Sequence, residues 1–203
     1  MFYKQIMHRD ITLASSSKSR IKILRNAGLK FKQTKPFCDE EEIKKQIQNL
    51  KNKPTYYVKR LSYEKAKSVS VLKKHKNNLV IGCDTIVVLN NKVFDKAKNF
   101  DQARDKIKKL SGKQHFIITG VTIFLDQKKI WSCSQKTKVV FRKLSDQQIK
   151  NYLKITGSQI LSSVGCYQIE ALGPIIIEDI KGDFFNVMGM PLFKLLKYLS
   201  KKK

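Results

Sequence analysis

The pattern of apolar and polar residues predicts one long buried strand near the middle of the chain. Residues 79–89 read LVIGCDTIVVL and are apolar almost throughout, which is typical of a strand that is buried on both faces. Asn90 and Asn91 predict a turn, and residues 92–94 (KVF) predict a strand that returns from it.

The beginning of the chain predicts a strand, a serine loop and a helix. Residues 11–14 (ITLA) suit a short strand, and three serines follow at positions 15–17. Residues 18–27 place Ile21, Ile23 and Leu24 on one approximate face of a helix, which Gly28 would end. Because serine is a favourable N-cap, the serine loop is expected to lead directly into this helix.

The remaining segments alternate between helical and extended patterns. Helical segments are expected in a charged stretch broken near Pro54 and at three later places: residues 39–70, 100–110, 145–154 and the segment after Pro191. Further strands are expected at residues 116–125, 129–142 (one strand or two) and 175–177. This interleaving predicts the α/β class with a mixed sheet. No linker-like composition divides the chain, so one domain over residues 1–203 is expected.

Asp84 interrupts the apolar run of the central strand. The chain has only 16 acidic residues, and this one lies inside its best strand candidate. Burying an unpaired carboxylate costs on the order of several kcal/mol, so Asp84 must be hydrogen-bonded, paired or placed beside a cation. On the pattern alone, a structural aspartate at a strand end and a functional carboxylate in a cleft both remain open.

The serine loop is a candidate anion site. A helix N-terminus presents free backbone N–H groups and the positive end of the helix dipole, and hydroxyl groups add donors. Arg20 lies in the first turn, where a cation opposes the dipole unless a phosphate binds there. The alternative is an ordinary N-cap followed by an arginine that faces solvent.

The acidic run at residues 39–42 (DEEE) also has two interpretations. It is a charged helix start, or one member meets Asp84 across a cleft and shares a divalent cation, since Mg²⁺ binds one or two carboxylates together with water and phosphate oxygens.

Other kinds of site have no support in the sequence. The histidines at positions 8, 75 and 115 are scattered, and the cysteines at 38, 83, 133 and 166 form no CxxC pair. Neither a zinc site nor a redox motif is therefore indicated, and the cysteines are expected to act as small apolar residues. A Walker A loop and a GxGxxG motif are both absent.

The formal net charge of +26 is extreme, and only six of the 42 basic residues are arginine. The charge either attracts a polyanion such as nucleic acid or nucleotide, or reflects lysine filling solvated surface. Surfaces dedicated to nucleic acid favour arginine, so the second explanation is preferred. The sequence has no signal-peptide pattern and no apolar run near the roughly 20 residues of a membrane span, so a cytoplasmic protein without membrane contact is expected.

Taken in order, these segments resemble the Maf family over nearly the whole chain. The opening LASSSKSRIKIL at residues 13–24 is similar to the family's LASxSxxRxxLL, and Asp39–Glu40 to its DE pair. Residues 60–66 (RLSYEKA) resemble its lysine-bearing helix, and residues 81–87 (IGCDTIV) its IGxDTVV strand. Later matches are LSGKQH at 110–115, TGV at 119–121, GCY at 165–167 and NVMGMP at 186–191.

The resemblance implies a nucleoside triphosphate pyrophosphatase that forms a monophosphate and pyrophosphate, with an elongated mixed sheet and a nucleotide cleft. It implies that Asp84 is the catalytic carboxylate, as general base or as a ligand of the metal, with Glu40 as the second metal ligand. The metal would be Mg²⁺, with Mn²⁺ as the alternative. Phosphate contacts are implied for Ser15, Ser17, Arg20, Lys65 and Lys96, and a contact near the base or ribose for Thr85.

Four positions depart from the family pattern. Many members read GKP where this chain has Asp95-Lys96-Ala97, and a familiar lysine is replaced by Ser163. A familiar glutamine is replaced by Glu170. Because an ionised glutamate only accepts hydrogen bonds, Glu170 would disfavour a pyrimidine keto edge and favour a base that presents N–H groups. The family's 7-methyl-GTP branch has glutamate near this position but lacks the threonine corresponding to Thr85, so the base stays open.

Two other functions remain as alternatives. A basic nucleic-acid-binding protein would use the charge but leaves Asp84 unexplained, and no specific nucleic acid is expected. A regulatory nucleotide-binding protein of cell division would bind nucleotide without releasing pyrophosphate. The oligomeric state is also open, with a homodimer among the alternatives.

Overall fold

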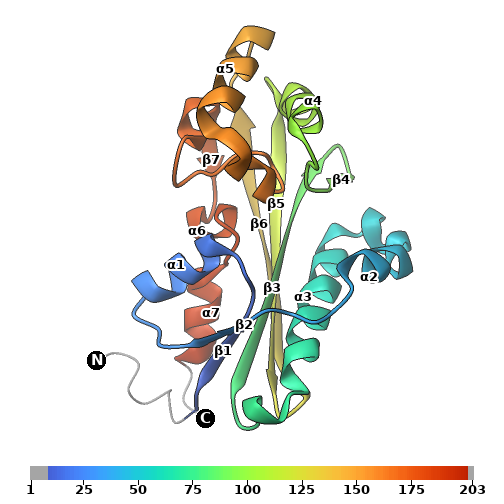
Figure 1. The fold of residues 1–203 in the computed structure, drawn as a ribbon, viewed down its shortest axis with the longest axis vertical. Coiled ribbons are helices and arrows are strands. Elements are labelled where there is room, and N and C mark those ends of the chain that lie inside the picture. The colour runs from blue at the N-terminus through green and yellow to red at the C-terminus, as the bar shows by residue number, and fades with distance from the viewer. Residues whose placement is uncertain (1–8, 201–203) are drawn as a thin grey trace.

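A computed structural model describes residues 9–200, and it is built around one seven-stranded mixed sheet (Figure 1). The path through the sheet is β2-β1-β3-β5-β6-β7, and β4 pairs with β3 off this path. The strands are β1 (Ile11–Ala14), β2 (Lys32–Thr34), β3 (Leu79–Leu89), β4 (Lys92–Phe94), β5 (Gln114–Leu125), β6 (Lys128–Phe141) and β7 (Ile177–Lys181). The α/β class with a mixed, elongated sheet is therefore confirmed.

Seven α-helices and several 3₁₀ turns surround the described part of the sheet. The helices are α1 (Lys18–Asn26), α2 (Glu40–Gln46), α3 (Pro54–Ser70), α4 (Phe100–Leu110), α5 (Asp146–Thr156), α6 (Phe184–Val187) and α7 (Leu192–Leu199). In Figure 1 the helices α2 and α3 lie on one side of the long strands, and α1, α6 and α7 lie on the other. None of the described helices combines the length and apolar character that a membrane span requires.

Most local predictions agree with these elements because they rest on specific backbone requirements. Asn90 and Asn91 both have positive φ, of 48° and 60°, as a tight turn between antiparallel strands demands. Ser145 and Gln148 form the reciprocal bonds of a capping box at the start of α5. Ser17 accepts the Arg20 N–H and caps α1.

The prediction of a strand at residues 175–177 is wrong. Residues Gly173–Ile175 form a 3₁₀ turn with Pro174 in its first positions, and β7 starts only at Ile177. Ile176 and Ile177 are buried in the core, which explains the apolar run. A short apolar run does not distinguish a strand from another buried segment, so the pattern alone was misleading.

Other parts of the pattern were less specific. The segment predicted as one strand or two is the single strand β6, and β2 and α6 were not predicted. Three mainly exposed residues, KQT, form β2 at the edge of the sheet, so no apolar alternation indicates it. The histidine at position 8 and the lysines at 201–203 lie outside the described residues.

The strand β3 changes partner halfway along one edge. Its first half pairs in parallel with β1, ending at Ala14 and Gly82, and its last three residues pair with β4 from Val87 onward. Its other edge pairs continuously with β5. Residues 83–86 therefore have a sheet neighbour on one side only, and this gap contains Asp84 and Thr85.

Two glycines let α3 lie directly on the sheet beside this gap. A Cβ at Gly82 would overlap the Ser62 carbonyl oxygen and the Ala66 backbone nitrogen, and one at Gly120 would lie 2.7 Å from the Val58 carbonyl oxygen. The obstructing atoms belong to the helix backbone, so they cannot move aside as a flexible side chain could. This close approach determines the distance between the α3 backbone and strand β3.

We therefore expect Gly82→Ala to destabilise the protein by about 3 kcal/mol, the upper part of the range for overpacked cores. Gly28→Ala is the matched control: its Cβ meets nothing within 4 Å, and its φ is +75°. That variant should lose only about 1 kcal/mol, the cost of a left-handed alanine. Urea denaturation of both variants measures the difference, and equal stabilities would contradict close packing of α3.

Candidate active site

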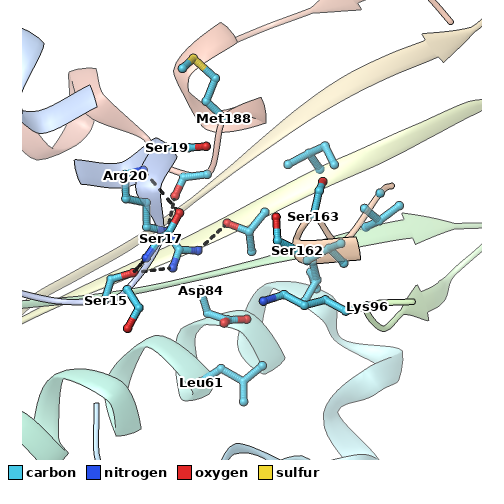
Figure 2. Close-up of a pocket in the computed structure, with 18 of the residues that line it drawn as sticks. Ser15, Ser17, Ser19, Arg20, Leu61, Asp84, Lys96, Ser162, Ser163 and Met188 are labelled. Atoms are coloured by element: carbon cyan, nitrogen blue, oxygen red, sulfur yellow. Dashed lines mark hydrogen bonds between the residues drawn. The ribbon is translucent and has the colours of Figure 1, made fainter. Parts of the chain in front are cut away.

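A cleft of about 780 Å³ lies over the gap in β3. Its walls come from the serine loop and α1, from α2 and α3, from the segment after β4, and from residues 159–170 and 187–189. Every residue predicted for the site lines this cleft: Ser15, Ser17, Arg20, Glu40, Lys65, Asp84, Thr85, Lys96 and Glu170. Figure 2 shows Asp84 between the serine loop on one side and Lys96 on the other.

Lys65 joins the two predicted acidic residues. Its ammonium group donates to Asp84 Oδ1 at 2.5 Å and lies 2.8 Å from Glu40 Oε2. Lys65 comes from α3, Glu40 from the first turn of α2 and Asp84 from β3. Asp84 is only 7% exposed. Its ion pair with Lys65 offsets the desolvation cost of burying a carboxylate in this strand.

The charges in this trio shift one another's pKa values. Burial raises the pKa of Glu40, but the Lys65 charge and its hydrogen bond outweigh burial and lower the pKa to about 2. Burial alone would lower the pKa of Lys65, yet the Asp84 and Glu40 carboxylates raise it above its usual value. Glu40 and Lys65 are therefore both charged at neutral pH.

Arg20 connects three parts of the cleft wall. Its Nε donates to the Gly189 carbonyl oxygen at 2.9 Å, its Nη2 to Thr85 Oγ1 at 3.0 Å and its Nη1 to Ser15 Oγ at 3.3 Å. The alternative of an arginine that faces solvent is thus wrong. The side chain turns away from the helix axis into the cleft, where its charge adds to that of the helix N-terminus.

A chain of polar groups behind Thr85 was missed by reasoning about single residues. Thr85 Oγ1 lies 3.1 Å from Thr119 Oγ1, which donates to the Asn186 carbonyl oxygen at 3.1 Å. The Asn186 amide in turn donates to Ile117 O and Thr137 Oγ1. Thr119 and Asn186 lie in the TGV and NVMGMP segments, so the only sequence signal for them was the family pattern.

Lys96 supplies the opposite wall. It follows β4, and Figure 2 shows its amine directed toward Asp84 across the cleft. Burial lowers its pKa, the Glu40 and Asp84 charges oppose that change, and Lys65 and Arg20 add to it. Three basic side chains, those of Arg20, Lys65 and Lys96, thus line the same cleft.

Glu170 lies at the exposed mouth of the cleft rather than beside Asp84. Its Oε1 accepts a 2.5 Å hydrogen bond from Ser19 Oγ on α1. Ser163, where the family pattern has lysine, donates to the Tyr167 carbonyl oxygen at 2.6 Å and stabilises its own loop. The mouth therefore presents an acceptor where many family members present an amide.

The donor set suits a hard divalent cation that keeps water and phosphate ligands. Glu40 and Asp84 both contact the Lys65 ammonium, so their carboxylates already converge on one positive charge. Among residues 9–200, no group of three or more His, Cys, Asp or Glu residues could hold a metal ion. Two carboxylates without a complete protein cage are what Mg²⁺ and Mn²⁺ accept.

Together, the fold and the cleft define an α/β protein with a buried carboxylate in a cleft lined by basic side chains. The family described as Maf-like protein matches residues 10–202, and the chain belongs to that family, which confirms the resemblance.

Three relatives that are named for different activities align over nearly their whole length. The chain is 41% identical over 186 residues to a dTTP/UTP pyrophosphatase of Thermosipho melanesiensis, covering 92% of this chain and 94% of the relative. It is 35% identical to a nucleoside triphosphate pyrophosphatase of Hyphomonas neptunium, covering 97% and 98%. A 7-methyl-GTP pyrophosphatase of Bartonella quintana is 38% identical, covering 94% of each chain.

The lowered pKa of Glu40 predicts a pH-dependent contribution to stability. Because the folded-state value is about 2 and the ordinary value 4.5, the contribution is present above pH 4.5 and is lost as the pH falls toward 2. The difference in unfolding free energy between wild type and Glu40→Gln should be largest near neutral pH and shrink over that window. Urea denaturation between pH 2.5 and 7 measures it. Glu178→Gln, exposed on β7, is the control, and a Glu40→Gln difference that is constant with pH would contradict the ion pair.

Proposed function

We propose that this protein hydrolyses nucleoside triphosphates to a nucleoside monophosphate and pyrophosphate, a house-cleaning reaction that keeps unwanted nucleotides out of nucleic acids. The relatives described above are pyrophosphatases by name, which supports this reaction class. The observation that carries it is the position of Asp84, a buried carboxylate facing a cleft lined by Lys65, Lys96 and Arg20.

The cationic walls suit a triphosphate. Phosphoryl chemistry depends mainly on positioning and on neutralising the charge of the phosphate oxygens. Ser15 and Ser17 place hydroxyl groups at the start of α1, whose free N–H groups also face the cleft. Lys96 approaches from the other side, so phosphate oxygens can be contacted from both walls.

Asp84 acts on the attacking water. As water adds to phosphorus, it loses a proton, and the bond between the α and β phosphates breaks with its electron pair leaving on pyrophosphate. Asp84 accepts that proton as general base, or it holds the metal ion instead; both roles remain alternatives. Lys65 restrains one carboxylate oxygen of Asp84 by its 2.5 Å bond, which orients the other.

Glu40 and Asp84 would hold the divalent cation, Mg²⁺ or Mn²⁺. Bound there, the ion would neutralise phosphate charge and polarise the phosphoryl group. A cytoplasmic location and a homodimer stay predictions.

Glu170 is the residue we assign to the choice of base. The relatives named above act on pyrimidine nucleotides in one case and on 7-methyl-GTP in another, so the choice of base differs between relatives. Glu170 lies at the mouth of the cleft and, when ionised, offers only acceptors. We therefore expect a preference for bases that present N–H groups.

Asp84→Asn should lower kcat about 10²- to 10⁴-fold, the range of general-base contributions. Asparagine retains an oxygen that can accept from Lys65 but removes the charge, so a loss of stability is expected and the melting temperature is measured beside turnover. Pyrophosphate release with Mg²⁺ and a panel of canonical and modified triphosphates measures turnover. Asp179→Asn, an exposed substitution on β7, is the control. Full activity of Asp84→Asn would remove Asp84 from the mechanism.

Glu170→Gln should shift the substrate profile toward pyrimidine triphosphates, because the amide restores a donor for a keto edge. The expected size is about tenfold in the ratio of kcat/KM values, the effect of one hydrogen bond of about 1.4 kcal/mol. Competition assays with paired purine and pyrimidine substrates measure this ratio directly. An unchanged profile would exclude Glu170 from base reading.

A further inference from the structure

Lys106 is a buried cation on α4 that lies outside the site described above. It is 8% exposed, although the other lysines of this helix, Lys108 and Lys109, are exposed. Its ammonium group donates to two main-chain carbonyl oxygens, those of Asp95 and of Val164, the latter at 3.1 Å. A buried ammonium group has to use its donors, and here backbone carbonyl groups accept them.

Those two carbonyl groups belong to two separate walls of the cleft. Asp95 immediately precedes Lys96, and Val164 immediately follows Ser163; all four residues line the cleft. The two segments lie more than 60 residues apart in the chain. One ammonium group on α4 therefore ties the Lys96 segment to the segment that leads to Glu170.

The side chain of Asp95 holds the same segment from its other side. Its carboxylate lies 3.7 Å from the Lys44 ammonium group on α2 and 3.9 Å from that of Lys51. Lys44 also lies 3.3 Å from Glu40 Oε1. The Lys96 segment is thus connected to α4 through its backbone and to the Glu40 side of the cleft through its carboxylate.

The local sequence explains why such support is needed. Lys96 lies between Asp95 and Ala97, and neither neighbour restricts the backbone as a proline would. Proline fixes φ and so restricts the backbone, and alanine does not. Ala97 is buried in the core beside Cys166, so packing supplies part of the restraint and the carbonyl contact of Lys106 supplies another.

We propose that Lys106, assisted by Asp95, is a positioning residue that holds the Lys96 segment against residues 162–164 and so keeps the Lys96 amine directed at the phosphates. The effect on turnover rests on the proposed function, whereas the restraint on the two segments does not. Displacing a phosphate-binding group by about 1 Å costs on the order of 10²-fold in rate.

The restraint is tested by hydrogen–deuterium exchange of the protein without substrate. Lys106→Met keeps the aliphatic stem and removes the donors, and we expect exchange in peptides covering residues 93–98 and 161–167 to be at least about tenfold faster. Lys109→Met makes the same substitution on the same helix at an exposed position and should leave both peptides unchanged. Equal protection in wild type and Lys106→Met would overturn the proposal.

The functional consequence is tested by a double-mutant cycle with Lys96. Lys106→Met alone should lower kcat/KM about 10- to 100-fold, but by less than about threefold when added to Lys96→Met, because residues that act through each other are not additive. Additive losses would mean that Lys106 acts only through general stability, and would overturn the positioning role.

A second variant covers the case in which Lys106→Met does not fold. Asp95→Asn alters an exposed carboxylate, and it should speed exchange in residues 93–98 alone, with a loss of kcat/KM of a few fold. No change in either quantity would again overturn the proposal.

A wild-type protein that releases no pyrophosphate, while Lys106→Met loosens both segments, would refute the proposed function and leave the restraint established.

Discussion

The arrangement of the site depends on the interruption of pairing along β3. The strand is bordered by β1 up to Gly82 and by β4 from Val87, so four residues between them have a free edge. A free edge exposes backbone and lets side chains on both faces reach the same space. Asp84 points toward α3 on one face, and Thr85 points toward Arg20 and Thr119 on the other.

The close packing of α3 turns that gap into an electrostatic site. Because Gly82 and Gly120 allow the helix backbone to approach the strands, Lys65 reaches Asp84 and Glu40 together. Two carboxylates close to each other would ordinarily raise one another's pKa, but the ammonium group between them keeps Glu40 ionised. Glu40 is therefore stable in its charged form, and both carboxylates lie in the cleft that Lys96 and Arg20 line.

The chain carries a large positive charge, and basic side chains also line the cleft. Scattered lysines produce a general field that draws in anions, but they do not specify one. The cations of the cleft differ from the scattered lysines because their positions are restrained: Lys65 by two carboxylates, Arg20 by three acceptors and, in our proposal, Lys96 through Lys106. Groups restrained before the substrate arrives need little reorganisation when charge develops on a phosphoryl group.

The sequence by itself determined the class, the long buried strand, the asparagine turn, the capping box of α5 and the residues that line the cleft. These features follow from burial, from local backbone preferences and, for the residues of the cleft, from the order of the family's motifs. The tertiary structure decided that Glu40 and Asp84 meet at Lys65, where the Arg20 side chain points, and that residues 173–175 form a turn rather than a strand. It also brought Lys106 to two carbonyl groups that no local pattern connects. Such contacts join residues tens of positions apart, so they exist only once the strands have been placed in register and the helices packed on them.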